Sequence, residues 1–141
     1  MSTSGPERSE NLQQRIRALT LPDAVRLARS GSMMERMALE RTFGKLVWEA
    51  LVHNPSLTVP EAARIAGMGI LPQPLLDQIV SNPAWLTSEE VRRRVLTNPR
   101  LRGQALMKVL RAVPRSELPL LAKRGALPFA VREAARRLSG G

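Results

Sequence analysis

Short apolar runs with helical spacing, each about ten residues long, follow one another along most of this chain. Within a run, apolar side chains recur three or four positions apart, which places them on one face of an α-helix. The chain has no tyrosine and few β-branched runs, and both features argue against a sheet. We therefore predict an all-α protein with about ten short helices, at residues 7–19, 21–30, 32–41, 43–53, 58–68, 71–81, 87–97, 101–112, 116–124 and 127–138.

The dipeptide Asn-Pro separates these runs at three places, beginning at Asn54, Asn82 and Asn98. Proline has no backbone N–H and moves the residue before it out of the helical region, so Asn-Pro cannot lie inside a helix. Asparagine also favours a local turn. Each Asn-Pro is thus predicted to end one helix shortly before the next begins.

The starts of the predicted helices carry signals of their own. A Ser or Thr three residues before a Glu or Asp can form a capping box, in which the hydroxyl and the carboxylate satisfy free backbone N–H groups. Leu-Pro is a second start signal, because proline in the first turn costs no hydrogen bond. The capping pairs are Thr20 with Asp23, Ser32 with Glu35, Thr58 with Glu61 and Thr87 with Glu90, and the Leu-Pro dipeptides begin at Leu21, Leu71 and Leu127.

The spacing of the Asn-Pro dipeptides indicates a repeat. Asn98 follows Asn54 by 44 residues, within the roughly 40–47 of HEAT and armadillo units, although Asn82 lies only 16 residues before Asn98. We therefore predict a degenerate helical repeat. The pattern of Asn-Pro breaks and helix-start signals resembles that of HEAT-like and leucine-rich-repeat-variant arrays of uncharacterised bacterial proteins, over about residues 21–139. The resemblance implies an α-solenoid that serves as an interaction surface, and it carries no catalytic residue with it.

We expect this repeat to form a single HEAT-like domain, a short α-solenoid of αα repeats, at residues 7–139. The polar residues 1–6 are predicted to be a disordered tail.

The basic residues are concentrated towards the C-terminus. The net charge of the chain is +10; residues 91–141 hold 13 Lys or Arg against 2 Asp or Glu, whereas residues 1–90 hold 9 against 10. Arginine supplies 19 of the 22 basic residues. One interpretation is a set of solvated helix faces in a chain encoded by GC-rich codons. The other is a basic surface that binds nucleic acid, anionic lipid or an acidic protein.

If the basic surface binds a partner, its candidate residues are mostly arginines on the outward faces of the last helices. Trp85 lies in the turn just before the arginine triplet at 92–94. An exposed Trp85 would suit base stacking or an interface hot spot, but we favour a Trp85 that packs under the start of the following helix. The candidates are Arg92, Arg93, Arg94, Arg100, Arg102, Arg111, Arg132, Arg136, Arg137 and Trp85.

The predicted helix at 32–41 carries three methionines, Met33, Met34 and Met37. Clustered methionine can form an adaptable binding groove or fill irregular gaps in a core. We favour the core.

Several classes of function find no support in the residues. The chain has no cysteine, which excludes disulfides, thiolate metal sites and cysteine nucleophiles. Its single histidine, His53, has no partner for catalysis suggested nearby, and the sequence Gly67-Met68-Gly69 lacks the strand and third glycine of a dinucleotide loop. No signal peptide is visible and no apolar run reaches the roughly 18 residues of a membrane span. We therefore expect a cytoplasmic protein without a cofactor.

The sequence thus predicts a non-enzymatic scaffold or adaptor that binds a macromolecular partner through its basic C-terminal helices. We favour a protein partner. An acidic protein would suit the arginines. The alternative is DNA, whose binding would weaken steeply with salt because phosphate contacts release counterions.

We predict that Val95→Ala or Leu106→Ala lowers the free energy of unfolding by at most about 2–4 kcal/mol, because both side chains are expected on the buried face of their helices. Thermal unfolding measures this effect. An unchanged melting temperature would show that the two residues lie on the exposed face of their helices.

Overall fold

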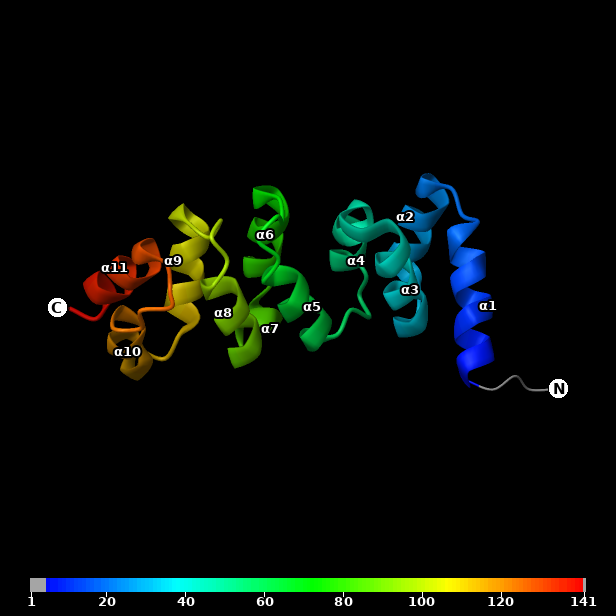
Figure 1. Cartoon of the computed structure of the whole chain (residues 1–141). Helices are drawn as coiled ribbons and strands as arrows, with labels where there is room; N and C mark the ends of the chain where they lie inside the picture. Colours follow the sequence, from blue (N-terminus) through cyan, green and yellow to red (C-terminus); the bar gives the residue numbers. More distant parts are fainter. Residues whose placement is uncertain (1–4, 141) are drawn as a thin grey trace. The chain divides into compact units, whose positions relative to one another are not determined.

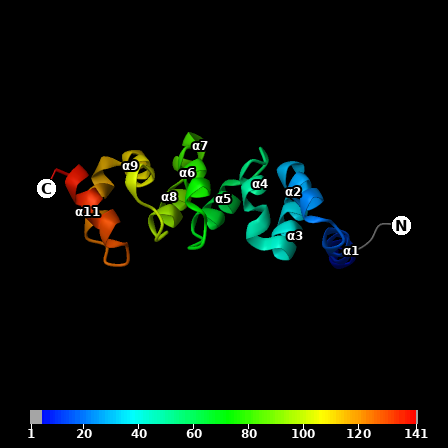
Figure 2. The same ribbon diagram turned by 90° about the horizontal axis from the view of Figure 1, so that it is seen from above.

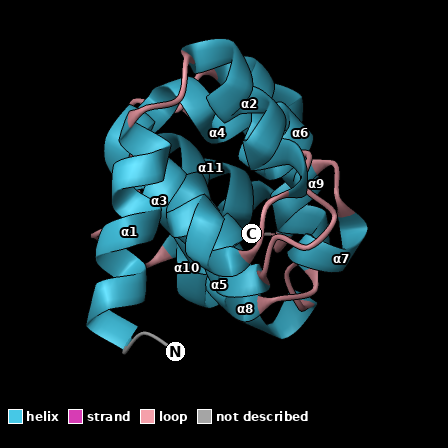
Figure 3. Ribbon diagram, turned by 90° about the vertical axis from the view of Figure 1, so that its right-hand side faces the viewer, coloured by secondary structure: helices cyan, strands magenta, loops and turns pink. Residues whose placement is uncertain are grey.

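The computed structural model describes the backbone of residues 5–140 and the side chains of residues 10–140. All regular elements in this range are helices joined by turns and loops, so the predicted all-α class is confirmed for the described chain (Figure 3). The chain divides into two compact units, Met1–Leu57 and Thr58–Gly141, which we call the N-terminal and C-terminal units. Of the predicted disordered tail, residues 1–4 lie outside the described range, whereas Gly5 and Pro6 belong to the first helix.

The N-terminal unit contains four α-helices and one 3₁₀ turn, η1, among its described residues (Figure 1). Helix α3 packs against both α1 and α2, and α2 also packs against α4. The elements are α1 (Gly5–Arg17), α2 (Leu21–Ser30), α3 (Met33–Phe43), η1 (Gly44–Val47) and α4 (Trp48–Val52).

The C-terminal unit contains the remaining helices (Figure 2). Helix α5 packs along α8, α6 packs on α9, and α10 packs on α11. Their buried faces are made of leucine, isoleucine, valine and alanine, and include Val95 and Leu106 as predicted. The elements are α5 (Val59–Ala66), α6 (Gln73–Val80), α7 (Pro83–Leu86), α8 (Glu89–Leu96), α9 (Gly103–Ala112), η2 (Arg115–Glu117), α10 (Leu118–Ala122) and α11 (Phe129–Leu138).

Two of the predicted capping boxes are complete. Ser32 accepts a hydrogen bond from the backbone N–H of Glu35, and the Glu35 carboxylate accepts one from the backbone N–H of Ser32. Thr58 and Glu61 form the same pair at the start of α5. Thr20 caps α2 with its hydroxyl, which accepts from the backbone N–H of Asp23.

The predicted box between Thr87 and Glu90 is wrong. Asn82-Pro83 begins a separate one-turn helix, α7, and the hydroxyl of Thr87 donates to the Ala84 carbonyl as that helix ends. The start of α8 is therefore one residue later, where the Ser88 hydroxyl accepts from the backbone N–H of Val91.

The predicted helix at 43–53 is also broken. Gly44 has φ of 58°, a left-handed conformation that ends α3 and begins the 3₁₀ turn η1. After this break Val47, Ala50 and Leu51 are buried, whereas Leu46 is exposed. Trp48 is also buried, and its Nε1–H donates to a Glu40 carboxylate oxygen at 2.9 Å.

The methionines of α3 do not fill the core. The buried face of this helix is formed by Arg36, Ala38 and Leu39. Arg36 lies in that face because its guanidinium donates to the Gly31 carbonyl. Met33, Met34 and Met37 lie on the other side, each about half exposed, so the prediction that they fill gaps in the core is wrong.

Asn54 links two helices of the N-terminal unit. Its side-chain amide donates hydrogen bonds to the carbonyls of Ala28 at 3.0 Å and Gly31 at 3.1 Å, at the C-terminal end of α2. Its side-chain oxygen accepts from the backbone N–H of Ser56 at 2.8 Å, which forms the predicted turn. Only 3% of Asn54 is exposed. The residue after α4 thus satisfies carbonyls that α2 leaves free.

Asn98 repeats this arrangement in the C-terminal unit. Its amide donates to the carbonyls of Ala66 at 2.8 Å and Met68 at 3.0 Å, where α5 ends, and its oxygen accepts from the backbone N–H of Arg100. Asn98 is completely buried. Asn82 is different: its oxygen accepts from the backbone N–H groups of Ala84 and Trp85, as a helix N-cap. The 44-residue spacing therefore connects two asparagines with the same structural role.

We predict that Asn98→Asp lowers the free energy of unfolding of the C-terminal unit by about 3 kcal/mol, because a buried carboxylate cannot donate and would face two carbonyl oxygens. Asn82→Asp is the matched control. It should be nearly neutral, because aspartate and asparagine cap helix N-termini equally well. Urea unfolding followed by circular dichroism compares the two, and equal stability of both variants would contradict the role of the Asn98 amide.

A candidate binding groove in the C-terminal unit

Three of the predicted arginines help to hold the fold. Arg92 donates to the Leu86 carbonyl at 2.8 Å, and Arg100 donates to the Leu71 carbonyl at 3.2 Å. The aliphatic part of Arg94 lies over the end of α5, where a Cβ atom on Gly67 would be 3.4 Å from its Cδ. These three side chains make contacts within the C-terminal unit. They are therefore weaker candidates for binding a partner than the sequence suggested.

Two arginines of α11 have neighbours on their own helix. Arg132 lies over the ring of Phe129, with its guanidinium carbon 5.9 Å from the ring centroid, and Arg136 forms an ion pair with Glu133 at 3.0 Å. Both contacts are between residues one turn apart, where such pairs are common. Arg137 is exposed at the end of the same helix.

The remaining cations of the C-terminal unit leave its surface positively charged. The unit has 14 Lys or Arg against 6 Asp or Glu, a net charge of +8. Seven more basic side chains of this unit are exposed and form no hydrogen bond or ion pair with the described residues. These are Arg93, Arg102, Arg111, Arg115, Lys123, Arg124 and Arg137.

Two of the predicted residues, Arg92 and Arg93, line a groove of about 290 Å³ between α8 and the η2–α10 segment. We call it the arginine groove. Its apolar wall is formed by Leu96, Val113, Leu120 and Leu121, and its charged rim by Glu89, Arg92, Arg93, Glu117 and Arg124. Leu120 is 61% exposed, whereas its neighbour Leu121 is buried.

This arrangement has the chemistry of a protein interface. An apolar centre with an arginine-containing rim is typical of interface hot spots. The guanidinium groups of Arg93 and Arg124 can each bind a carboxylate through two parallel hydrogen bonds. A nucleic acid, which carries a charge on every nucleotide, fits less well than a segment with one carboxylate, because Glu89 and Glu117 place negative charge on the same rim.

The other predicted residues do not join this groove. Arg102 lies just before α9, Arg111 lies in α9, and neither they nor the α11 arginines line the groove. Trp85 lies in α7, partly buried, with its backbone N–H bonded to Asn82. Two of the residues predicted from the sequence therefore line the groove, and the others lie on different elements.

Sequence reasoning missed Leu120 and Arg124. A signal was present in Leu118-Pro-Leu-Leu-Ala122, where four of five residues are apolar. A helix this short that packs with one face must leave one of these side chains exposed. That residue is Leu120.

Comparison of the chain with protein-family models, curated proteins and solved structures gave no match. Among the described residues, no helix is long and apolar enough to cross a membrane. Within the same range, no three His, Asp or Glu side chains form a group that could hold a metal ion.

Because Arg92 is bonded to a backbone carbonyl and Arg93 is not, the two neighbours should differ in their effect on stability. We predict that Arg92→Ala lowers the free energy of unfolding by about 1 kcal/mol, whereas Arg93→Ala changes it by less than about 0.5 kcal/mol. Urea unfolding measures both. A loss of similar size in both variants would mean that the Arg92 contact with Leu86 contributes nothing specific.

Proposed function

We propose that this protein is a HEAT-like helical-repeat adaptor, without catalytic activity, that binds a protein partner in the arginine groove. The observation that carries the proposal is the exposure of Leu120 in a groove that two unpaired arginines, Arg93 and Arg124, also line. The partner segment presents an apolar side chain to Leu120 and at least one carboxylate to the rim. Apolar burial supplies affinity and the arginines select an acidic segment.

The repeat architecture is part of the proposal. It is supported by the common role of Asn54 and Asn98, each of which bonds to the end of the helix packed beside its own. It is also supported by the packing of α5 on α8 and of α6 on α9, the pairing expected of equivalent helices in successive αα repeats. Repeat proteins expose extended surfaces, which suits binding in a surface groove.

Nucleic acid is the second candidate, and the observation that favours it is the net charge of +8 on the C-terminal unit. A basic surface of this size attracts any polyanion. The apolar wall of the arginine groove and the carboxylates on its rim favour protein over phosphate.

The test is quantitative affinity capture from the native cells, comparing wild-type protein with Leu120→Glu and Arg93→Glu. The matched controls are Ile70→Glu, because Ile70 is 60% exposed and lies outside the groove, and Arg137→Glu, because Arg137 is exposed and unpaired. We expect a protein that the wild type and both controls retain and that both groove variants lose, by about tenfold or more.

Two results would contradict this proposal. One is that no captured protein distinguishes groove variants from controls. The other is binding of a purified DNA duplex that falls by about 10³–10⁵ between 50 and 200 mM salt, as expected for six to ten phosphate contacts, and that Arg93→Glu abolishes. That result would support the nucleic-acid alternative.

A further inference from the structure

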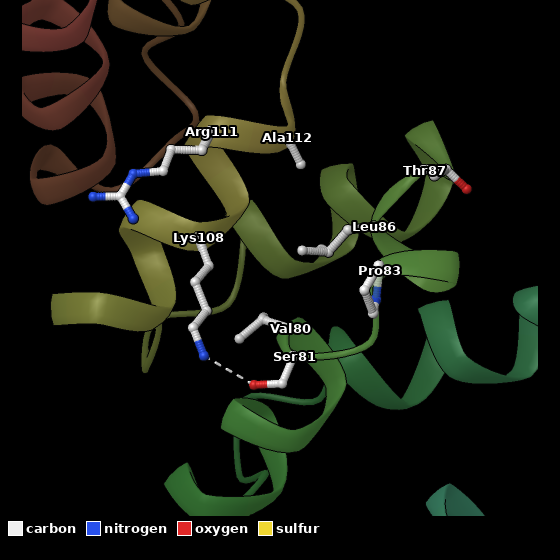
Figure 4. Close-up of a pocket in the computed structure, with 8 residues that line it drawn as sticks. All are labelled: Val80, Ser81, Pro83, Leu86, Thr87, Lys108, Arg111 and Ala112. Atoms are coloured by element: carbon white, nitrogen blue, oxygen red, sulfur yellow. Dashed lines mark hydrogen bonds between the residues drawn. The ribbon is translucent and has the colours of Figure 1, made fainter.

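A second groove lies on the other helices of the C-terminal unit, between α6–α7 and α9. It consists of two adjoining cavities of about 480 and 350 Å³, which share Val80 and Lys108 as lining residues. We call it the lysine groove. Figure 4 shows Val80 and Leu86 facing Ala112 across the larger cavity, so its centre is apolar. The lysine groove has no lining residue in common with the arginine groove.

The charges of the lysine groove are carried mainly by α9. Lys108 and Arg111 line it from α9, and Arg102 lines it from the position just before this helix, nine residues before Arg111. The side chains of Arg102 and Arg111 form no ion pair or hydrogen bond with the described residues. Figure 4 shows Lys108 reaching across to Ser81, whose hydroxyl accepts from Nζ at 3.0 Å, whereas the Arg111 side chain extends away from Val80 and Leu86.

The opposite wall offers little to neutralise these cations. Asp77 is the acidic residue in the lining, and its carboxylate already accepts a hydrogen bond from the Gln73 amide at 3.0 Å. The larger cavity has no acidic residue among those that line it. The groove is therefore an apolar trough with a row of cations on one edge.

We propose that the lysine groove is a second binding site, and that it binds an acidic amphipathic helix from a protein partner. Side chains on the apolar face of such a helix pack between α6 and α9, as ridges pack into the groove between two helices. Its carboxylates, spaced over two to three turns, face Arg102, Lys108 and Arg111. Binding by strand addition is excluded, because the described residues of this unit provide no sheet edge for a strand to extend.

This site goes beyond the proposed function because it uses different helices and different residues. A chain with both grooves can hold two partner segments at once, the arginine groove through α8 and α10 and the lysine groove through α6, α7 and α9. The protein then acts as a connector between two acidic partners. Each groove contributes its own binding free energy. Two partner segments joined in one molecule therefore bind more tightly than either segment alone.

The test uses a designed peptide of about 18 residues, longer than the roughly 12–15 that are marginal for an isolated helix. The peptide has a leucine stripe flanked by glutamates, and a second peptide has glutamine at each glutamate position. We expect the full chain to bind the glutamate peptide about tenfold or more tightly than the glutamine peptide. Lys108→Gln/Arg111→Gln should reduce that affinity about tenfold, measured by fluorescence anisotropy.

The matched control is Lys123→Gln/Arg137→Gln, which removes one exposed lysine and one exposed arginine that line neither groove, and it should leave the affinity for the peptide within about twofold. Equal losses in both double variants would show attraction by overall charge and overturn the proposal, as would no detectable binding or equal affinity for both peptides. Loss in a third variant, Arg93→Gln/Arg124→Gln, without loss in Lys108→Gln/Arg111→Gln would assign the peptide to the arginine groove and also overturn the proposal. Tighter binding of a DNA duplex that Lys108→Gln/Arg111→Gln abolishes would assign the lysine groove to nucleic acid.

Discussion

The structure depends on how short helices satisfy their ends. The last four carbonyls of any helix lack partners within it, and in helices of about ten residues such groups are a large share of the backbone. Where a helix end is buried, water cannot supply the missing donors. Asn54 and Asn98 supply them from another helix, through an amide that donates twice while its oxygen holds the following turn. One side chain thus fixes a helix end, a turn and the contact between two helices.

This device frees the outward faces for other uses. The helices of the C-terminal unit are held by their buried apolar faces and by internal bonds from Asn98, Arg92 and Arg100. The side chains of Arg93, Arg124 and Arg137 form no such bonds with the described residues, and Leu120 is exposed. The surface of the C-terminal unit thus combines unpaired cations with apolar grooves.

Much of the local structure could be predicted from the sequence, because it depends on residues close together in the chain. The bounds of α2, the capping boxes at Ser32 and Thr58, and the breaks at Asn-Pro all follow from rules that act within a few residues. Errors occurred where two local signals compete. Thr87 and Ser88 are both good caps, and the extra turn of α7 decides in favour of Ser88.

The grooves and the long-range role of the asparagines could not be predicted in this way. Nothing near Asn98 in the sequence shows that its amide reaches carbonyls about 30 residues earlier. Met33 and Met37 have helical spacing like that of a core face, but Arg36 takes the buried position through its bond to Gly31. The arginine groove likewise depends on which leucine of α10 is left outside.

The proline after each buried asparagine also affects how the protein ages. Asparagine normally deamidates when the backbone nitrogen of the next residue loses its proton and attacks the side-chain carbonyl. The nitrogen that follows Asn54 and Asn98 belongs to proline and has no proton to lose. The two amides that connect the helices are therefore protected from this reaction by their neighbours, and long storage should leave them intact.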